Sequence, residues 1–276
     1  MPEYYEPLIQ QDPCPGLPIL DIGEWSLEKH DLLRKYVAAS WAARQKWPYR
    51  CFIDLFSGPG RVRVRKSNVV TDGGAVVAWR QASEKGGRFT KVIVGDIDPN
   101  AVNACKARLE ALGAPVDALV GPATQTVDQV LTIANPNGLH LAYLDPYNLE
   151  HLPFSVIERL AKFKNIDILV HFSVMDLQRE LELDFERDQS RFELFAPDWR
   201  NQIDPRSMTK QEARAAFVRY WLSLVDSLGF SCSRERPLMT NSKNGPLYRM
   251  MFLMRHKLAD KLWSDIAKPP QGSLFN

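Results

Sequence analysis

Short apolar runs and amphipathic segments alternate along much of the chain, which predicts strands and helices in turn. The runs are almost continuously hydrophobic, as is typical of parallel strands that are buried on both faces. This alternation predicts a doubly wound, mostly parallel α/β sheet. The predicted strands are residues 51–56, 91–99 (a strand with its acidic end), 116–120, 139–144 and 166–172, and the predicted helices between them begin near residues 72, 99, 124 and 154.

The N-terminal segment departs from this alternation. Residues 1–25 hold acidic residues and prolines but no lysine or arginine, and they predict an extended arm on the surface. A helix is predicted from Ser26, which can act as its N-cap, to Trp47, where Pro48 ends it.

The C-terminal half departs from it as well. Residues 175–208, with a charged helical stretch at 176–193, predict an insertion that could cover a site. After it we expect a helix at 209–228, an antiparallel strand pair at 230–238 and 247–255, and a last helix at 257–266. We therefore expect a single domain, 1–276, made of an arm and helix (1–47), a core with the site (48–174), an insertion or lid (175–208) and a C-terminal part (209–276).

Composition narrows the class of protein. A chain of 276 residues with 45% hydrophobic and 25% charged residues is typical of a soluble globular domain. Its formal charge of +2 is too small to indicate nucleic-acid binding. Because no apolar run approaches the roughly 20 residues of a membrane span, and residues 1–18 lack the features of a signal peptide, we expect a cytoplasmic protein with no membrane partner. The four cysteines lack metal-ligand spacing, so we expect reduced thiols and no metal site.

The first strand ends in a turn of small residues, Ser57-Gly58-Pro59-Gly60. Glycine permits unusual backbone angles and lets a ligand approach the main chain. A dinucleotide fingerprint would need a third glycine where Arg63 stands, and a phosphate-binding loop would need Gly-Lys-Ser/Thr. The run 54–60 instead resembles motif I of methyltransferases that use S-adenosylmethionine (SAM). The candidate cofactor-binding residues in it are Asp54, Phe56, Gly58, Pro59 and Gly60.

Two acidic strand ends belong to the same predicted crevice, because ligands of doubly wound sheets bind at the carboxyl ends of the strands where strand order reverses. Asp96 ends the second strand and is expected to bind ribose hydroxyls, whereas Asp98 is expected to be an ordinary turn residue. Asp145-Pro146-Tyr147 follows the fourth strand and resembles the Asp-Pro-Pro-Tyr motif of amino-methyltransferases, with one proline fewer. Asp145 and Tyr147 are therefore the candidate catalytic residues, and a plain strand-ending turn is the alternative.

Other side chains near this crevice have competing explanations. Arg61, Arg63 and Arg65 alternate with valines, so they would share one face and could bind phosphates of a nucleic acid, or simply form a solvated edge. His171 is expected to be a core or rim histidine. The tryptophans Trp199 and Trp263 are expected to pack in the core. A cytosine-C5 mechanism would need a cysteine after the fourth strand, and none is there.

Several of these pieces together resemble the three-Cys-motif partner (TcmP) family of bacteria. They are Trp25-Ser26-x-x-Lys29-His30, the run 54–60, Asp96-x-Asp98, Asp145-Pro146-Tyr147 and Trp263. The resemblance implies a Rossmann-like class I SAM-dependent methyltransferase fold and a companion protein bearing three cysteines, of radical-SAM-like type. It supplies no substrate. The chain departs from many methyltransferases after its third strand, where Gly121-Pro122-Ala123-Thr124 contains no acid for adenine.

Two functions follow as hypotheses. The first is a SAM-dependent methyltransferase that acts on an amino nitrogen of a nucleic acid or nucleotide. The second is a non-catalytic module with the same fold that binds a partner protein or nucleic acid. The intact motif I favours the enzyme, and the altered Asp-Pro-Tyr motif with the missing adenine acid favours the module.

Overall fold

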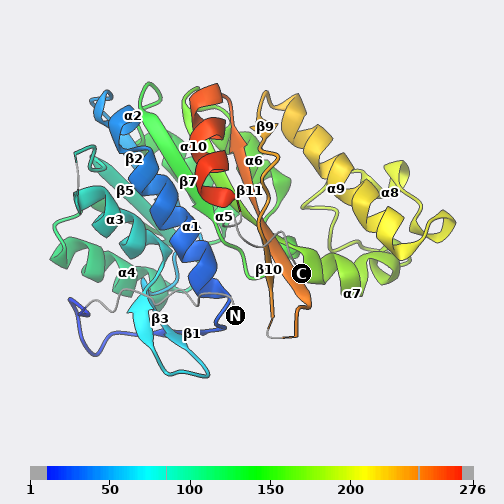
Figure 1. Ribbon diagram of the computed structural model, residues 1–276, viewed down its shortest axis with the longest axis horizontal. Coiled ribbons are helices and arrows are strands. Elements are labelled where there is room, and N and C mark those ends of the chain that lie inside the picture. Colours follow the sequence, from blue (N-terminus) through cyan, green and yellow to red (C-terminus); the bar gives the residue numbers. More distant parts are fainter. Residues whose placement is uncertain (1–10, 85, 242, 269–276) are drawn as a thin grey trace.

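The computed structural model describes residues 11–84, 86–241 and 243–268. Its main sheet has eight strands in the order β10-β11-β8-β7-β2-β5-β6, with β9 paired to β11 (Figure 1). The strands from β8 to β6 are parallel, and strand order reverses at β2. This confirms the predicted Rossmann-like, doubly wound sheet of the class I SAM-dependent methyltransferase type. The strands are β2 (Arg50–Asp54), β5 (Lys91–Asp96), β6 (Val116–Val120), β7 (Leu139–Leu144), β8 (Ile166–Ser173), β9 (Ser231–Cys232), β10 (Leu238–Thr240) and β11 (Pro246–Met254).

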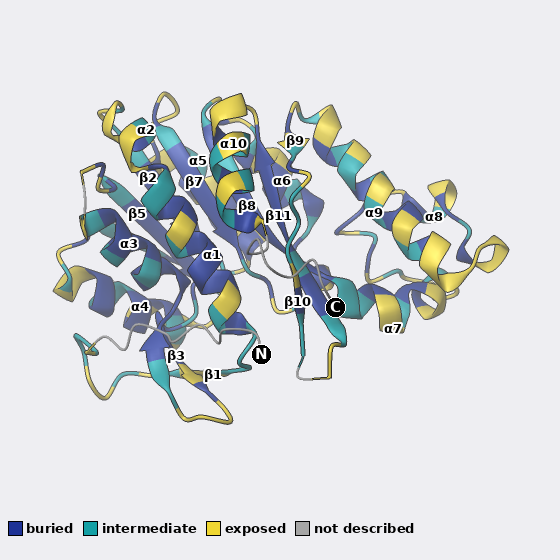
Figure 2. Cartoon of the chain, viewed as in Figure 1, coloured by how far each residue is buried: buried dark blue, intermediate teal, exposed yellow. Residues whose placement is uncertain are grey.

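Helices cover both faces of the sheet, because successive strand residues point to opposite sides. In β2, Phe52 belongs to one hydrophobic core, and Cys51 and Ile53 belong to the other. Figure 2 shows the sheet buried and the outer helix faces exposed. The first layer contains α1 (Ser26–Ala39), α3 (Gly74–Glu84), α4 (Pro99–Ala111) and α10 (Lys257–Ala267), and the second contains α5 (Ala123–Ile133), α6 (Phe154–Leu160), α7 (Val174–Phe185) and α9 (Lys210–Ser227).

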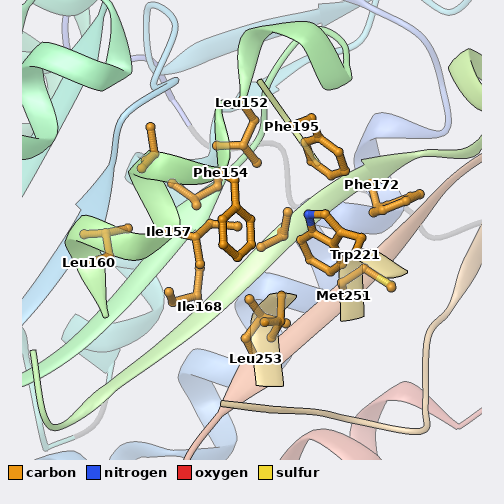
Figure 3. Packing of buried hydrophobic residues seen from close by; sticks show 14 of the residues in the cluster. Leu152, Phe154, Ile157, Leu160, Ile168, Phe172, Phe195, Trp221, Met251 and Leu253 are labelled. Carbon is orange, nitrogen blue, oxygen red and sulfur yellow. The ribbon is translucent and has the colours of Figure 1, made fainter. Parts of the chain in front are cut away.

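The segment predicted as a lid contributes to the second core. Figure 3 shows the centre of this core, where Phe154, Phe172 and Trp221 meet, and Phe195 from the insertion stacks on Trp221 at 5.4 Å. Trp199 is fully buried in it, as expected. In Figure 1, α7, α8 (Trp199–Gln202) and α9 lie to the right of β11, whereas α4 lies near the left edge of the sheet.

The predicted helix at 176–193 is wrong at its end, because α7 stops at Phe185. The cause is Asp184, whose buried carboxylate accepts hydrogen bonds from the backbone N–H groups of Arg191 and Phe192 and from the Ser190 hydroxyl. Because of these bonds, N–H and O–H groups of the loop that follows α7 have a hydrogen-bond acceptor, which a continued helix would not provide. Two short 3-10 helices, η1 (Leu149–His151) and η2 (Pro205–Ser207), complete the second half.

Two further boundaries differ from prediction. The predicted first helix breaks at Ser40 and resumes as α2 (Trp41–Gln45). The N-cap of α1 is Trp25 and not Ser26. The predicted strand 230–238 is divided into β9 and β10. Pro237 lies just before β10, and it has no N–H with which to donate to a strand ladder.

A second, small sheet lies beyond the carboxyl end of β2, directly after the glycine turn (Figure 1). It consists of β1 (Leu20–Ile22), β3 (Arg61–Val64) and β4 (Val70–Asp72), with β1 parallel and β4 antiparallel to β3. The predicted insertion after the glycine turn is therefore a β-hairpin, and the predicted arm adds a strand to it; its residues 1–10 lie outside the described part. No helix within the described ranges is long and apolar enough to cross a bilayer.

Candidate functional site

The glycine turn after β2 needs glycine at two positions. Gly58 has φ +53° and Gly60 has φ +72°, in the left-handed region that other residues rarely adopt. A Cβ on Gly60 would lie 3.0 Å from the Cys105 Sγ, so this position also lacks room. A Cβ on Gly58 would meet only the Leu20 side chain, at 3.6 Å. The backbone at Gly58 is therefore the part of the turn that remains open to a ligand.

Asp96, at the end of β5, is joined to this turn. Its Oδ2 accepts a hydrogen bond of 2.9 Å from the Gly58 N–H, and its Oδ1 accepts one of 3.0 Å from the Asp98 N–H. A carboxylate has about four lone-pair directions, so Asp96 keeps acceptor capacity for hydroxyl groups. Asp98 itself caps α4 by accepting from the Asn100 N–H at 2.9 Å, which confirms its structural role.

Asp54 supports the turn from below. Its carboxyl is buried and accepts a hydrogen bond of 3.0 Å from the N–H of Phe56, a half-buried residue that packs against the second core. Burial raises the pKa of Asp54 well above its ordinary value, opposed by the Phe56 hydrogen bond and reinforced by the nearby Asp145 and Asp96. The structure thus places Asp54 under the turn and Gly58 at its surface.

The N-terminal arm is fastened to the turn by Arg108 of α4, which the sequence did not single out. Its guanidinium is fully buried and donates to both carboxylate oxygens of Asp12, each at 3.0 Å. It also donates to the carbonyl oxygens of Leu17, Pro18 and Pro59. All five N–H groups of the guanidinium are therefore used. Burial alone would raise the pKa of Asp12, but its hydrogen bonds with Arg108 and with the Cys14 N–H, together with the Arg108 charge, lower that pKa below its ordinary value.

Asp145, at the end of β7, is the centre of a buried polar cluster. The Lys29 Nζ lies 2.7 Å from each of its carboxylate oxygens, and the His171 Nδ1 lies 3.0 Å from its Oδ1. The Tyr143 hydroxyl donates to Oδ2 at 3.3 Å. Burial alone would raise the pKa of Asp145, but the Lys29 cation and then His171 hold that pKa far below its ordinary value. Asp145 is therefore ionised, and its acceptor directions are occupied by neighbouring side chains.

Helix α1 and strand β11 close this cluster. The buried His30 follows Lys29 on α1, and burial, together with the Lys29 charge, lowers the pKa of His30 to about 4. The Tyr248 ring of β11 meets the His171 ring edge-on at 4.2 Å, and the Tyr248 hydroxyl donates to the Trp25 carbonyl at 2.5 Å. The Trp-Ser-x-x-Lys-His pattern at 25–30 thus belongs to the surroundings of Asp145.

Tyr147 lies outside the cluster. Its side chain is 91% exposed on the loop after β7, and its ring lies 6.3 Å from that of His151. The structure therefore separates the two candidate catalytic residues: Asp145 is enclosed, and Tyr147 faces solvent.

The three arginines do not form one exposed set, which corrects the expectation from their alternation. The Arg61 side chain is buried in an ion pair with Asp72, because Asp72 lies on β4, the strand paired with β3 in the hairpin. Arg63 and Arg65 are exposed beside the arm, where Arg63 approaches the Asp21 carboxylate at 3.6 Å and Arg65 donates to the Asp21 carbonyl at 3.3 Å. Only Arg63 and Arg65 remain candidates for phosphate contacts.

Comparison with known proteins concerns the fold. No protein-family model matches the chain, and neither does any curated protein. Among solved structures, an O-methyltransferase from Bacillus cereus in complex with SAH is 12% identical, with a TM-score of 0.49 and coverage of 86% of this chain and 84% of that chain. A protein described as a candidate RNA methyltransferase from Pyrococcus horikoshii is 11% identical, with a TM-score of 0.42 and coverage of 87% and 91%. TYW2 from M. jannaschii in complex with AdoMet is 7% identical, with a TM-score of 0.41 and coverage of 84% and 76%.

Because these identities are low, the function is inferred from the residues of this chain and not from these structures. The resemblance to three-Cys-motif partner proteins stays a prediction.

Proposed function

We propose that this protein is a SAM-dependent methyltransferase whose cofactor binds at the Gly58–Gly60 turn. The observation that carries the proposal is the contact between the Asp96 carboxylate and the Gly58 N–H at the point where strand order reverses. It joins an open main-chain turn to an acceptor for ribose hydroxyls. SAM supplies an electrophilic methyl group on a sulfonium. Asp54 supports the turn from inside, and Gly58 offers the open backbone that a ligand can approach.

The proposed methyl acceptor is an amino nitrogen of a nucleic acid or nucleotide. Tyr147 supports this class, because an exposed aromatic ring next to the site can stack on a base. The backbone carbonyl oxygen of Pro146 and Asp145 Oδ1 lie 3.1 and 3.0 Å from the same nitrogen, His171 Nδ1, so the two oxygens can face one N–H group. This acceptor pair therefore suits N–H donors. A companion protein with three cysteines, implied by the family resemblance, is the proposed partner.

The cofactor assignment is tested by titration calorimetry with SAM, S-adenosylhomocysteine and NAD. We expect the first two to bind and NAD to give no heat. Binding of NAD without binding of SAM would overturn the proposal.

Replacing Asp96 by alanine is expected to weaken SAM binding by about 1–3 kcal/mol, because the ribose loses its acceptor and the Gly58 N–H loses its partner. Asp98→Ala is the matched control. It removes the cap of α4 two residues further on, and we expect it to lower stability by about 1 kcal/mol without changing SAM affinity. Equal SAM affinity of wild type and Asp96→Ala would remove Asp96 from the cofactor site.

The exposed arginines are expected to contribute to nucleic-acid binding through phosphate contacts. The double variant Arg63→Ala/Arg65→Ala should reduce the slope of log affinity against log salt by up to about two units, measured with duplex DNA and RNA. The control is Arg159→Ala/Arg219→Ala, which removes the same charge from α6 and α9. If both double variants have the same slope, Arg63 and Arg65 form a solvated face.

The second candidate function, a non-catalytic module, is favoured by one observation. Three side chains already occupy the Asp145 carboxylate, which leaves little capacity for a substrate amine. The two functions differ in one measurement. A catalyst transfers radioactive methyl from SAM to total RNA, DNA, nucleotides or the companion, whereas a module binds SAM or a partner and transfers nothing.

A further inference from the structure

The Asp145 cluster contains a histidine nitrogen without a partner. The His171 side chain is buried, with 8% of its surface exposed, and its Nε2 atom has no hydrogen-bond partner among the described residues. Unpaired buried polar atoms cost free energy and are uncommon in native structures. Other buried atoms of the described residues share this state, among them His30 Nδ1, but His171 is the one whose ring lies against the Asp145 carboxylate.

The neighbours of the other ring nitrogen determine where the proton is. The Nδ1 atom lies 3.0 Å from Asp145 Oδ1 and 3.1 Å from the Pro146 carbonyl oxygen, and both of these oxygens can only accept. Nδ1 therefore carries the hydrogen. In the neutral ring Nε2 then has a free lone pair, and this nitrogen can accept a proton.

The groups around His171 come from three elements. Lys29 of α1 and Tyr143 of β7 contact the Asp145 carboxylate, and the Tyr248 ring of β11 meets the His171 ring edge-on at 4.2 Å. His171 therefore shares the Asp145 carboxylate with a lysine and a tyrosine.

The cluster continues into the floor of the cofactor turn through Tyr143. The Tyr143 hydroxyl donates to Asp145, and its ring lies within 2.7 Å of where a Cβ on Gly74 would stand. That same Cβ position is 3.5 Å from Asp54 Oδ2, directly beneath the turn. The Tyr143 side chain thus contacts Asp145 through its hydroxyl and lies near Asp54 through its ring edge.

We propose that His171 is the catalytic residue that receives the proton released when the acceptor is methylated, and this rests on the proposed methyltransferase function. In the step, the acceptor nitrogen uses its lone pair to form a bond to the methyl carbon. The carbon–sulfur bond breaks and its electrons remain on sulfur, which gives S-adenosylhomocysteine. The N–H proton of the methylated nitrogen moves to Nε2, and the ionised Asp145 stabilises the resulting imidazolium. Asp145 and Lys29 are positioning residues that act through His171.

The first test uses the full-length protein labelled with ¹⁵N-histidine and no methyl acceptor. Without ligand, the His171 spectrum should show the Nδ1–H form. Because SAM carries a sulfonium charge and S-adenosylhomocysteine does not, we expect the His171 Nε2 signal at fixed pH to differ between the two complexes. His140 is the internal control, since it lies at the amino end of β7 and stacks on Phe163 at 4.1 Å. The variant His171→Gln identifies the signal.

The second test measures methyl transfer from SAM to total RNA, DNA and nucleotides. His171→Gln keeps an N–H donor for Asp145 but cannot take up a proton. We expect it to bind SAM as wild type does and to lose about 10²-fold or more in transfer rate.

The outcomes separate this inference from the proposed function. Failure of SAM to bind in calorimetry would overturn the proposed function and this inference with it. Binding of SAM with the His171 signal identical in the SAM and S-adenosylhomocysteine complexes, or with His171→Gln as active as wild type, would overturn the role of His171 alone.

Discussion

Asp145→Asn is expected to reduce methyl transfer by about 10²-fold or more while SAM binding persists. The amide is neutral and can donate as well as accept, so it no longer fixes the His171 Nδ1–H and no longer stabilises positive charge on the ring. SAM affinity should change little, because the cofactor turn is held by Asp54 and Asp96. Transfer of radioactive methyl to RNA, DNA and nucleotides, with calorimetry in parallel, measures both quantities.

The same substitution is expected to lower stability, because it leaves the Lys29 cation buried without its partner. Breaking a buried pair by removing one member costs about 3–5 kcal/mol. Lys29→Met/Asp145→Asn is the matched variant: it removes both charges, so we expect it to regain much of this stability while transfer stays lost. Urea unfolding of the two variants gives the comparison.

The sign of the pH dependence follows from the pKa of Asp145. Its folded pKa lies below the unfolded value of about 3.9, so its contribution to stability is present above that value and is lost as pH falls through the folded pKa. The stability difference between wild type and Asp145→Asn should therefore shrink in acid.

The double variant Lys29→Met/Asp145→Asn also tests the role of Asp145 in transfer. If it transfers methyl as fast as wild type, Asp145 is a structural cap of β7.

Gly58→Val is expected to abolish SAM binding. The residue has φ +53°, where a β-branched side chain is strained, and the new side chain would stand over the open face of the turn. The strain also disturbs the Gly58 N–H that Asp96 holds. Titration calorimetry at high protein concentration measures the loss.

Gly113→Val is the control for backbone strain. Gly113 has φ +75°, and a Cβ there would meet nothing within 4 Å, so the substitution carries a similar conformational penalty after α4 without entering the turn. It should lower the unfolding midpoint and leave SAM affinity intact. If Gly58→Val binds SAM as tightly as Gly113→Val does, the cofactor lies elsewhere.

The parts of the fold that the sequence predicted depend on local patterns. Apolar runs at 139–144 and 166–172 fall on β7 and β8 almost residue by residue, because a strand buried on both faces must be hydrophobic throughout. The placement of the glycine turn beside Asp96 follows from parallel strands, whose carboxyl ends share one edge. The Gly58 N–H and the Asp96 carboxylate are accordingly hydrogen-bonded in the structure.

The rest depends on contacts between residues far apart in sequence. Lys29 and Asp145 are separated by 116 positions, and no periodicity relates them. The burial of Arg61 could not be inferred from alternation with valines, since it depends on Asp72 arriving from the next strand of the hairpin. His171 has the local features of an ordinary core residue, and only the positions of Asp145 and Pro146 around it indicate where its proton lies.

The attachment of the arm to Arg108 has a consequence for the order of folding. Asp12 precedes Arg108 by 96 positions, so during synthesis the arm leaves the ribosome long before its anchor exists. The Pro59 carbonyl, which the same guanidinium holds, must wait as well. Closing so long a loop carries an entropy cost that only the completed α4 can offset. Residues 12–18 are thus among the last to find their place, and the Gly58–Gly60 turn matures together with them.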